Sequence, residues 1–329
     1  MAKLKQRVSY RQKEGLSVDM FTREELAQIH LATLRVLNEA GVKIYNDEAL
    51  NVFSDGGCKV DRSEKIVRIP QYVLEECIRS APSSVLLAGR DPKHDRVLET
   101  NRISWTNFGS GIKIYDVNTG ILRGTTTQDV RDTALLVDYL DNVDVYSQAV
   151  VARDTPKEKE DLIAAEAFLT NTSKHCHHID LQSGKSAKKF IEMGAAIAGG
   201  MDELKKRPII SALICPTSPL QISKEGCDII MEFAKAEVPI NILSMALSGG
   251  TAPITIDGTL VVHNAEVLAG IVLTQLVNKG APVIYGSSTA TFDMKTGTAS
   301  VGSPELGMIS ACVACLAQFY NLPSYTAGG

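Results

Sequence analysis

Three histidines within four residues form the densest group of ligand-type side chains in the chain. They lie in the segment Lys174-His-Cys-His-His-Ile-Asp180. Alternate residues of a strand face the same side, so His175 and His177 share one face and His178 points the other way. No carboxylate or cysteine set completes a recognisable zinc pattern around them. The segment therefore predicts hydrogen bonding inside a core, with no metal site, and it makes Asp180 a polar pocket residue near the end of a strand.

Two further pairs have spacing that suits chemistry. His263 and Glu266 are three residues apart on a predicted helix, so they share a face and can bond to each other. A buried polar pair that braces the helix against a strand is the other interpretation. Cys312 and Cys315 have the spacing of a redox motif, but a reactive pair needs a helix N-terminus and these cysteines fall inside a predicted helix. Packing is therefore predicted for the cysteines.

Two loops that follow predicted strands combine hydroxyl side chains with glycine or proline. They are Cys215-Pro-Thr-Ser218 and Ser248-Gly-Gly-Thr251. Backbone N–H groups in glycine loops and at helix starts can bind a phosphate or a carboxylate, so Ser218 and Ser248 are candidate binding residues. Glycine pairs also simply permit tight turns, and that alternative stays open.

Three more candidates follow predicted strands. Ser288 ends the stretch Gly286-Ser-Ser288, whose small side chains suit a wide mouth of a site. Arg153 and Asp154 come after an apolar run and just before a predicted helix start. Arg153 can order Asp154 there or meet acidic groups, but a surface pair at a helix start explains both residues equally well.

Seven segments that end in small or polar residues define the fold. Helical stretches separate most of these segments, which span residues 103–109, 145–154, 175–183, 208–218, 239–249, 282–289 and 322–329. Repeated strand–helix units of this number predict an α/β fold of the TIM (β/α)8 type, incomplete, with about seven strands. The chemistry of such barrels lies on the loops after the strands, where the candidates above occur.

The first hundred residues have a different pattern. Thr22-Arg-Glu-Glu25 is a capping box that predicts a helix start, and a further helix is predicted over residues 71–80. We expect residues 1–100 to form a small α+β cap and residues 101–329 to form the partial barrel. Within the barrel portion, a hairpin is predicted around Asp116-Val-Asn-Thr-Gly120, and Thr155-Pro156 is predicted to begin a helix. The pairs Ser218-Pro219 and Ser303-Pro304 repeat this arrangement of a cap followed by proline, so they predict helix starts as well.

Composition narrows the class of protein. The chain has 329 residues, 44% of them hydrophobic, and a net charge of −4, which gives no electrostatic reason to expect nucleic acid or an acidic membrane as partner. No apolar run reaches the length needed to span a bilayer. Seven scattered cysteines, an odd number, favour reduced thiols and a cytoplasmic location.

Several longer segments resemble the trimethylamine:corrinoid methyltransferase family, and the resemblance extends from about residue 20 to the end of the chain. The segments are Lys174–Asp180, Leu213-Ile-Cys-Pro-Thr-Ser-Pro219, Leu243-Ser-Met-Ala-Leu-Ser-Gly-Gly250, Gly258-Thr-Leu-Val-Val-His-Asn-Ala-Glu266, Tyr285-Gly-Ser-Ser-Thr289 and Gly302-Ser-Pro-Glu-Leu-Gly307. The resemblance implies a TIM barrel that moves a methyl group from a methylated amine to the Co(I) corrinoid of a small partner protein. It also implies cytoplasmic methylamine metabolism, as in methanogenesis, and a homo-oligomer.

The resemblance suggests an explanation for the position at which the chain ends. Trimethylamine members carry pyrrolysine, encoded by an in-frame amber codon, just after the seventh strand, which places it at or just after Gly329. The chain end is then interpreted as an amber codon read as a stop, although a fragment boundary gives the same end. On the amber interpretation, the isolated polypeptide lacks its last barrel unit and its electrophile. We expect it to be inactive and prone to aggregate through exposed strand edges.

A cationic amine substrate directs attention to aromatic side chains, whose faces attract cations. Four aromatic side chains lie on or near strands that face the predicted mouth, namely Phe108, Tyr146, Phe292 and Tyr325. Phe108, in Asn107-Phe-Gly-Ser, sits at a strand end. Core packing is the alternative for each of them.

The sequence is therefore compatible with three alternative functions. The first is methyl transfer from trimethylamine, in which pyrrolysine activates an amine nitrogen that leaves poorly by itself. The second is methyl transfer from a quaternary amine such as glycine betaine, whose nitrogen already carries the positive charge and needs no pyrrolysine. The third is a non-catalytic barrel that binds amines. The codon after Gly329 distinguishes the first two, and a spectral change in an added Co(I) corrinoid protein distinguishes both from the third.

Overall fold

The computed structural model describes residues 20–328, which divide into two compact units. The first unit comprises residues 86–213. The second combines residues 20–85 with residues 214–328. The second unit thus takes in segments far apart in the sequence, and each unit has its own strands, helices and buried side chains.

The first unit is built on parallel strands joined by helices. In chain order these elements are β8 (Val145–Ser147), α5 (Glu160–Asn171), β9 (His175–His178), α6 (Gly184–Ala198), α7 (Met201–Lys206) and β10 (Ile210–Ile214). β9 pairs in parallel with both β8 and β10, so that His177 stands between Ser147 and Ser211. Parallel neighbours joined by helices are the βαβ arrangement that the sequence predicted.

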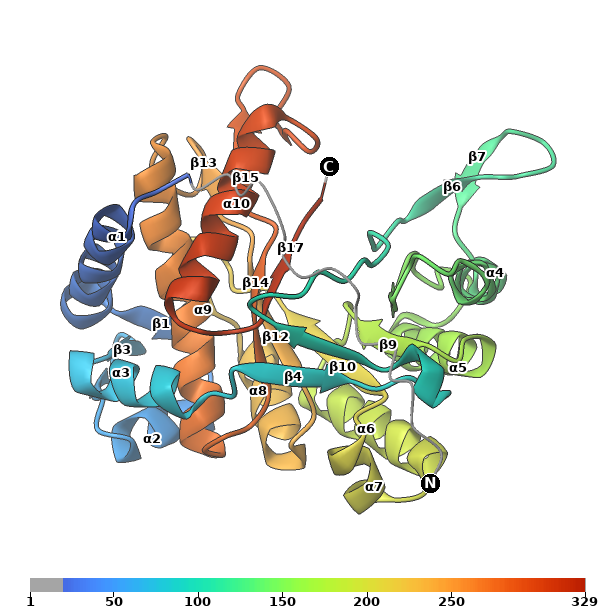
Figure 1. Ribbon diagram of the computed structural model, residues 1–329, viewed down its shortest axis with the longest axis horizontal. Helices are drawn as coiled ribbons and strands as arrows, with labels where there is room; N and C mark the ends of the chain where they lie inside the picture. The colour runs from blue at the N-terminus through green and yellow to red at the C-terminus, as the bar shows by residue number, and fades with distance from the viewer. Residues whose placement is uncertain (1–19, 329) are drawn as a thin grey trace. The chain divides into compact units, whose positions relative to one another are not determined.

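The remaining elements of the first unit precede β8. They are the 3₁₀ turn η2 (Pro92–His94), β5 (Arg96–Glu99), β6 (Lys113–Tyr115), β7 (Leu122–Gly124) and α4 (Thr127–Tyr139), with η3 (Lys157–Lys159) before α5. β6 and β7 form the predicted hairpin, which extends away from α4 (Figure 1). The strand predicted over residues 103–109 is reduced to one parallel bridge between Thr106 and Val145. Asn107 replaces further strand pairing there, because its amide bonds both the N–H and the carbonyl of Ser147.

The second unit has its own parallel set. The strands are β12 (Ile240–Ser244), β14 (Val283–Ser287) and β17 (Ser324–Thr326), and the helices are α8 (Lys224–Ala236), α9 (Ile256–Val277) and α10 (Pro304–Phe319). β14 pairs in parallel with both β12 and β17. Ser303 caps α10 by accepting the N–H of Leu306, with Pro304 in the first turn, as the sequence predicted.

The N-terminal part of the second unit is a small α+β segment. Its elements are α1 (Arg23–Arg35), the π-helical turn η1 (Val36–Ala40), β1 (Val42–Ile44), α2 (Asp47–Asp55), β2 (Lys59–Asp61), β3 (Ile66–Arg68) and α3 (Gln71–Ser80). The chain passes from this unit to the first one within β4 (Ser84–Leu87). β1, β2 and β3 are antiparallel, and β11 (Gln221–Ile222) joins β1 in parallel. The predicted capping box of Thr22 and Glu25 is present at the start of α1.

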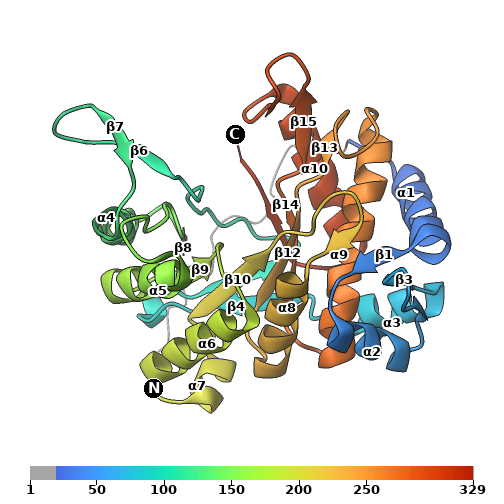
Figure 2. The same cartoon turned by 180° about the vertical axis from the view of Figure 1, so that it is seen from behind.

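α9 forms the centre of the second unit. It lies beside β12 and β14 and is packed on other sides by α1, α3 and α8 (Figures 1 and 2). Its apolar residues occur on all faces, which is typical of a helix buried all round. It is the one helix of residues 20–328 long and apolar enough to cross a membrane, and 78% of its apolar window is buried inside the structure.

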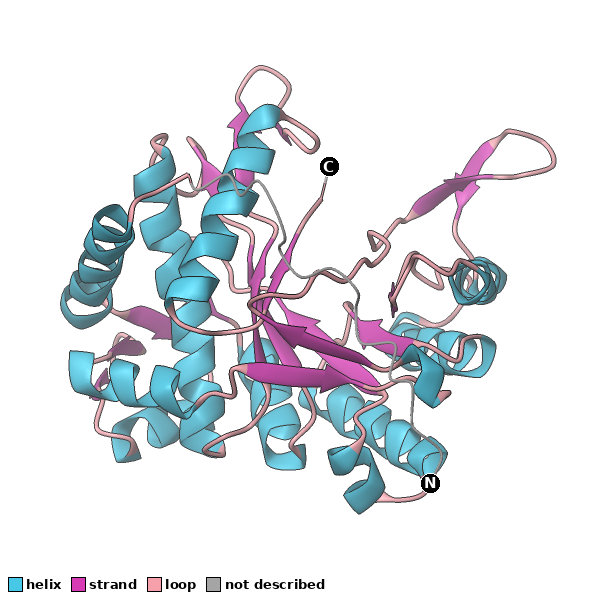
Figure 3. Cartoon of the chain, viewed as in Figure 1, coloured by secondary structure: helices cyan, strands magenta, loops and turns pink. Residues whose placement is uncertain are grey.

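Three short strands complete the second unit, and they lie in the loops that follow β12 and β14. They are β13 (Leu247–Ser248), β15 (Ala290–Asp293) and β16 (Thr298–Ala299). β13 pairs with β15, and β15 pairs with β16 (Figure 3 shows strands and helices by colour).

Two predicted helix starts are wrong. α5 begins at Glu160, not at Thr155-Pro156, and the Thr155 hydroxyl donates to the carbonyl of Ala152 instead of capping the helix. The serine–proline pair at 218–219 lies in a loop, because the hydroxyl of Ser218 bonds to Glu266. The helix after it, α8, is capped by Ser223, whose hydroxyl accepts the N–H of Gly226.

Candidate active site

A buried carboxylate on α9 accepts hydrogen bonds from a strand end and from a loop of the second unit. Oε2 of Glu266 accepts hydrogen bonds from the hydroxyls of Ser218 (2.8 Å) and Ser244 (2.6 Å), and its Oε1 accepts the N–H of Leu220 (2.9 Å). Ser244 ends β12, and Ser218 and Leu220 lie in the loop before β11. We call Glu266, Ser218, Leu220 and Ser244 the Glu266 cluster.

The electrostatics of this cluster combine two opposed effects. The side chain of Glu266 is fully buried, and this burial raises its pKa, while the three hydrogen bonds lower it; burial prevails. An N–H and two hydroxyls all donate to the carboxyl oxygens, which is the set of partners that an ionised carboxylate can accept. The sequence singled out Ser218 here, but it did not predict Ser244 or the central role of Glu266.

His263, one turn before Glu266 on α9, has a different partner. Its Nδ1 lies 2.9 Å from the hydroxyl oxygen of Thr289, and that hydroxyl donates to the carbonyl of Ser244 at 3.3 Å. Nδ1 therefore carries the proton, since the hydroxyl proton is already committed. Burial lowers the pKa of His263 to about 3. The bond between His263 and Glu266 that the sequence left open is not formed, because each residue contacts a different strand end.

Of the other candidates in the second unit, Ser288 lies nearest to this cluster. Its N–H donates to the carbonyl of Ser244 at 2.9 Å. Ser248 is buried and donates to the carbonyl of Ile254 at 2.9 Å, so it closes its own loop and leaves that hydroxyl proton unavailable to a ligand. The structure thus joins Ser218 and Ser288 through Ser244 and leaves Ser248 in a separate loop.

The two aromatic candidates of the second unit lie on short strands. Phe292 is half-buried on β15 and lies against Gly250, where an added Cβ would come within 3.2 Å of its ring. Tyr325 is half-buried on β17, directly opposite Gly286 of β14.

Asn241 is a buried polar residue that the sequence analysis missed. It lies in the apolar stretch of β12, is fully buried, and neither atom of its amide has a hydrogen-bond partner within residues 20–328. A Cβ added at Gly286 would stand 2.1 Å from its Oδ1, so the amide lies over the backbone of the neighbouring strand. The only signal in the sequence is one amide within a run of apolar residues.

In the first unit, two of the three histidines form a chain of hydrogen bonds. Nδ1 of His175 lies 3.1 Å from the carbonyls of Ala88 and Pro208, so it carries the proton and leaves Nε2 as an acceptor. The hydroxyl of Ser211 donates to that Nε2 (2.7 Å) and accepts from Nδ1 of His177 (2.7 Å). Burial lowers the pKa of His175 to about 4 and that of His177 to about 3, so both rings are neutral. The shared face predicted for this pair is confirmed.

His178 points the opposite way and packs between helices. Its ring lies edge-on to Phe168 and Phe190, and its Nε2 donates to the carbonyl of Asp161 at 3.0 Å. The N–H of Asp180 donates to the remaining nitrogen at 3.2 Å. Oδ2 of Asp180 is buried and has no hydrogen-bond partner among the described residues. Asp180 therefore offers an unpaired carboxylate oxygen just beyond the end of β9.

The last three candidates are exposed parts of the first unit. Phe108 is 66% exposed and follows Asn107, which pairs with the end of β8. Asp154 accepts the N–H and the hydroxyl of Thr127 at 2.7 and 2.8 Å, so it supports the start of α4. Arg153 is exposed. Asp154 is therefore a surface residue, but the helix start that it supports is that of α4 and not that of the helix that follows it in the chain.

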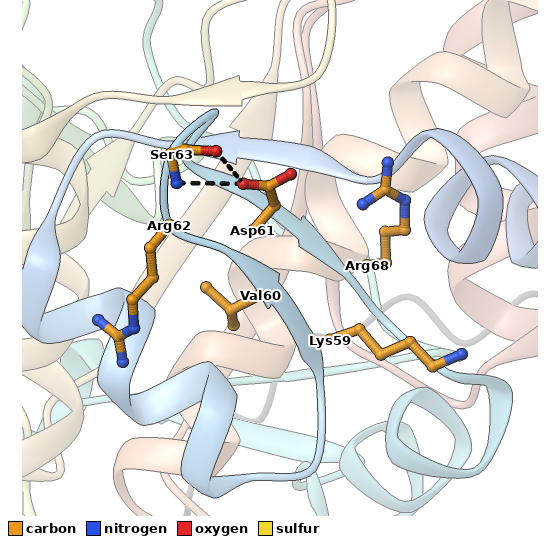
Figure 4. A pocket seen from close by; sticks show the side chains of 6 residues that line it. All are labelled: Lys59, Val60, Asp61, Arg62, Ser63 and Arg68. Carbon is orange, nitrogen blue, oxygen red and sulfur yellow. Dashed lines mark hydrogen bonds between the residues drawn. The ribbon is translucent and has the colours of Figure 1, made fainter.

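No group of three histidine, cysteine, aspartate or glutamate side chains within residues 20–328 could hold a metal ion. A surface hollow of about 550 Å³ lies over the β2–β3 hairpin and is lined by Lys59, Arg62 and Arg68 around Asp61 and Ser63 (Figure 4). It contains none of the predicted site residues. The carboxylate of Asp61 accepts hydrogen bonds from both the N–H and the hydroxyl of Ser63.

Comparison with known proteins identifies the family. The fold described above is of the α/β class, with parallel strands and helices alternating in each unit. A family model described as trimethylamine methyltransferase (MTTB) matches residues 2–329. The chain belongs to the trimethylamine methyltransferase family.

Two relatives are named after different methyl donors. The chain is 51% identical over 316 residues to the trimethylamine methyltransferase MttB of Desulfitobacterium hafniense, covering 96% of this chain and 64% of that protein. It is 32% identical over 312 residues to a glycine betaine methyltransferase of Desulfitobacterium hafniense, covering 94% and 64%. The chain thus spans less than two thirds of the length of these relatives.

A solved structure has the same fold. The crystal structure of the Methanosarcina barkeri monomethylamine methyltransferase (MtmB) superposes with a TM-score of 0.56 at 14% identity, covering 91% of this chain and 65% of that one. At this identity the likeness extends to the fold alone.

Proposed function

We propose that the complete protein transfers a methyl group from trimethylamine to the Co(I) corrinoid carried by a partner protein. The observation that carries this proposal is the family match over residues 2–329, together with 51% identity to a trimethylamine methyltransferase against 32% to a glycine betaine methyltransferase. We further propose a TIM (β/α)8 barrel for the complete fold. The parallel strand–helix units and the likeness to the monomethylamine methyltransferase support it.

The reaction moves a methyl group as a cation equivalent. The electron pair of Co(I) forms the new carbon–cobalt bond, and the pair of the broken C–N bond stays on nitrogen. The nitrogen keeps the proton of the trimethylammonium ion, so neutral dimethylamine leaves and cobalt becomes formally Co(III). Positioning the methyl carbon in line with cobalt is the main task of the protein. Because the corrinoid is carried by the partner, it is a substrate of this protein and not a resident cofactor.

Pyrrolysine is proposed as the residue that activates the amine. When present, it supplies an electrophilic imine carbon that makes the amine nitrogen a good leaving group. The expected position, at or just after Gly329, lies outside the described residues. The residues before it suit such a group, because the N–H of Ala327 bonds to the carbonyl of Ser287 and continues β17 along the end of β14. Catalytic groups in barrels lie at this carboxyl edge of the strands.

Asp180 and Phe108 are proposed to receive the cationic amine. Asp180 offers a buried, unpaired carboxylate oxygen beyond the end of β9, and Phe108 offers an exposed ring beside the end of β8. A carboxylate and an aromatic face are the two groups that attract an alkylammonium ion. Within the second unit, the proposed substrate-binding residues are Ser218, Ser288, Phe292 and Tyr325. The cap over residues 1–100, the cytoplasmic location and the homo-oligomer stay predictions of the sequence.

The test uses the complete protein with a Co(I) corrinoid protein and either trimethylamine or glycine betaine. We expect trimethylamine alone to convert the Co(I) absorption spectrum to that of methyl-Co(III). Turnover of betaine alone would replace the proposal by the quaternary amine alternative, and amine binding without a spectral change would favour the non-catalytic barrel. Sequencing the gene across codon 330, with mass spectrometry of the complete protein, tests for pyrrolysine independently.

The two residues proposed to hold the amine have their own variants. Asp180→Asn keeps the size of the side chain and removes the charge, so we expect KM for trimethylamine to rise about tenfold or more, with a smaller change in kcat. Asp154→Asn, at the start of α4, is the matched control and should leave KM unchanged. Equal KM values for the two variants would remove Asp180 from the site.

A further inference from the structure

The loop that contains Ser218 and Leu220 is held in an unusual backbone conformation. Leu220 has a φ angle of +58°, in the left-handed region that a leucine rarely adopts. A residue stays in that region only where its surroundings fix it, and such residues concentrate at functional sites. Here the fixing contact is identifiable, because the N–H of Leu220 donates to Oε1 of Glu266 at 2.9 Å.

The same carboxylate reaches other strand ends of the second unit. The hydroxyl of Ser244 at the end of β12 donates to Oε2 of Glu266, and the carbonyl of Ser244 accepts the N–H of Ser288 after β14. Ser218 completes the set by donating to the same Oε2. One side chain on α9 therefore fixes the loop 215–220 directly, together with the ends of β12 and β14.

Packing alone does not account for a glutamate at this position. α9 is apolar on all faces, and Glu266 lies among residues that are themselves fully buried. A buried carboxylate is expensive to desolvate, and apolar replacements of buried charged groups are often neutral or stabilising. A leucine would fill the same space without that penalty, but it would leave the N–H of Leu220 and two hydroxyls without their acceptor.

We infer that Glu266 is a positioning residue for the proposed methyl transfer, which orients the loop 215–220 and Ser218 against the ends of β12 and β14. The inference rests on the proposed function for its catalytic part only. Glu266 does not touch substrate; it acts through the Ser218 hydroxyl and the strained backbone of Leu220. His263 assists from one turn away, because it holds Thr289 against the carbonyl of Ser244.

The experiment compares Glu266→Gln and Glu266→Leu in the complete protein. Glutamine keeps the shape, accepts from Leu220 through its oxygen and donates to the two serine hydroxyls, whereas leucine can do neither. Glu225→Leu, an exposed position in the first turn of α8, is the matched control for the loss of a carboxylate. Two properties are measured: amide hydrogen exchange at Leu220, and kcat and KM with trimethylamine and the Co(I) corrinoid protein.

For Glu266→Leu we expect exchange at Leu220 to accelerate by about tenfold or more and kcat to fall by about tenfold to a hundredfold. Glu266→Gln is expected to restore both properties to within about threefold of wild type. Unchanged exchange in the leucine variant, or faster exchange with unchanged kcat, would overturn the inference. Loss of kcat in the glutamine variant while exchange stays slow would also overturn it, because the charge and not the positioning would then matter.

A second set of variants covers the case in which Glu266→Leu does not fold. Ser218→Ala, Ser244→Ala and the double variant form a cycle around the same oxygen. We expect their effects on kcat to be non-additive by at least about threefold, since both hydroxyls act through Glu266. Independent effects would contradict the inference. If the wild-type protein transfers no methyl group at all, the proposed function fails, and the exchange data still decide whether Glu266 orders the loop.

Discussion

In the first unit two hydrogen-bonded histidines and their serine partner lie on strands, whereas in the second unit the buried Glu266 and His263 lie on a helix. His175, His177 and Ser211 lie on β9 and β10 and bond to one another and to backbone carbonyls. Glu266 and His263 lie on α9 and bond to strand ends and loops. The first arrangement consists of neutral groups. The second connects separate backbone segments and is centred on an ionisable carboxyl group.

This difference matters for how each unit responds to its surroundings. A chain of hydrogen bonds between neutral buried rings stabilises a core. Its contribution to stability depends on pH, because protonating a buried imidazole breaks the pattern of donors and acceptors. A cluster that ties loops to a helix instead controls the positions of those loops. We therefore assign a structural role to the histidine chain and a positioning role to the Glu266 cluster, and the following measurements can separate the two.

The largest effect is expected from acid. The folded-state pKa values of His175 (about 4), His177 (about 3) and His263 (about 3) lie below the ordinary value of 6.5 because these rings are buried. Stability from a depressed pKa is present above 6.5 and is lost as the pH falls toward the folded value. Between pH 6.5 and pH 5 each ring should cost about 2 kcal/mol of unfolding free energy. Urea unfolding at a series of pH values measures this.

Variants locate the acid effect within the molecule. Replacing one ring, as in His263→Phe, should remove about 2 kcal/mol of the loss between pH 6.5 and pH 5, and His177→Phe should remove a similar amount. An unfolding free energy that is flat between pH 6.5 and pH 5 would show that the rings are not buried as neutral groups. Glu266 works in the opposite direction, because its pKa is raised by burial and its contribution is lost as the pH rises through the folded pKa. Glu266→Gln should therefore gain stability relative to wild type as the pH rises.

The next effect concerns the hydroxyl shared by the two histidines of the first unit. Ser211→Ala leaves Nε2 of His175 and Nδ1 of His177 without their common partner in a fully buried place. We expect the free energy of unfolding to fall by about 3 kcal/mol, since two buried polar atoms lose a bond. Chemical denaturation measures the change, and Ser54→Ala, an exposed position of α2, should shift it by less than about 0.5 kcal/mol. A loss below about 1 kcal/mol would mean that water replaces the hydroxyl.

Much of the fold could be predicted from the sequence because its strands carry clear patterns of apolar residues. The histidine segment is an example, since the alternation of a strand fixes which rings share a face, and the structure confirms it. The Glu266 cluster could not be predicted in the same way. Its members are up to 48 residues apart along the chain, and no periodicity connects a glutamate on a helix with a serine in a distant loop. The spacing of His263 and Glu266 indicated a shared face but not two different partners.

Short-range signals failed where tertiary contacts competed with them. The side-chain amide of Asn107 makes the hydrogen bonds to Ser147 that the backbone of the predicted first strand was expected to make. Strand propensity does not predict such a substitution of side chain for backbone. Ser218 has the pattern of a helix cap, yet the carboxylate of Glu266 takes its hydroxyl. Asp180 was predicted as a polar residue near a strand end, which its position confirms, but the unpaired oxygen depends on the burial of one atom.

The smallest effect compares two capping boxes that look alike in the sequence, one in each unit. In the second unit Thr22 and Glu25 form the box, so Thr22→Ala should cost about 1 kcal/mol of unfolding free energy. In the first unit Thr155 precedes α5 without capping it, and its hydroxyl bonds to the carbonyl of Ala152, so Thr155→Ala should cost less than about 0.5 kcal/mol. Thermal or urea unfolding of both variants against wild type makes the comparison within one protein. Equal losses would mean that Thr155 supports its helix in solution, and the start of α5 would then have to move from Glu160 toward Pro156.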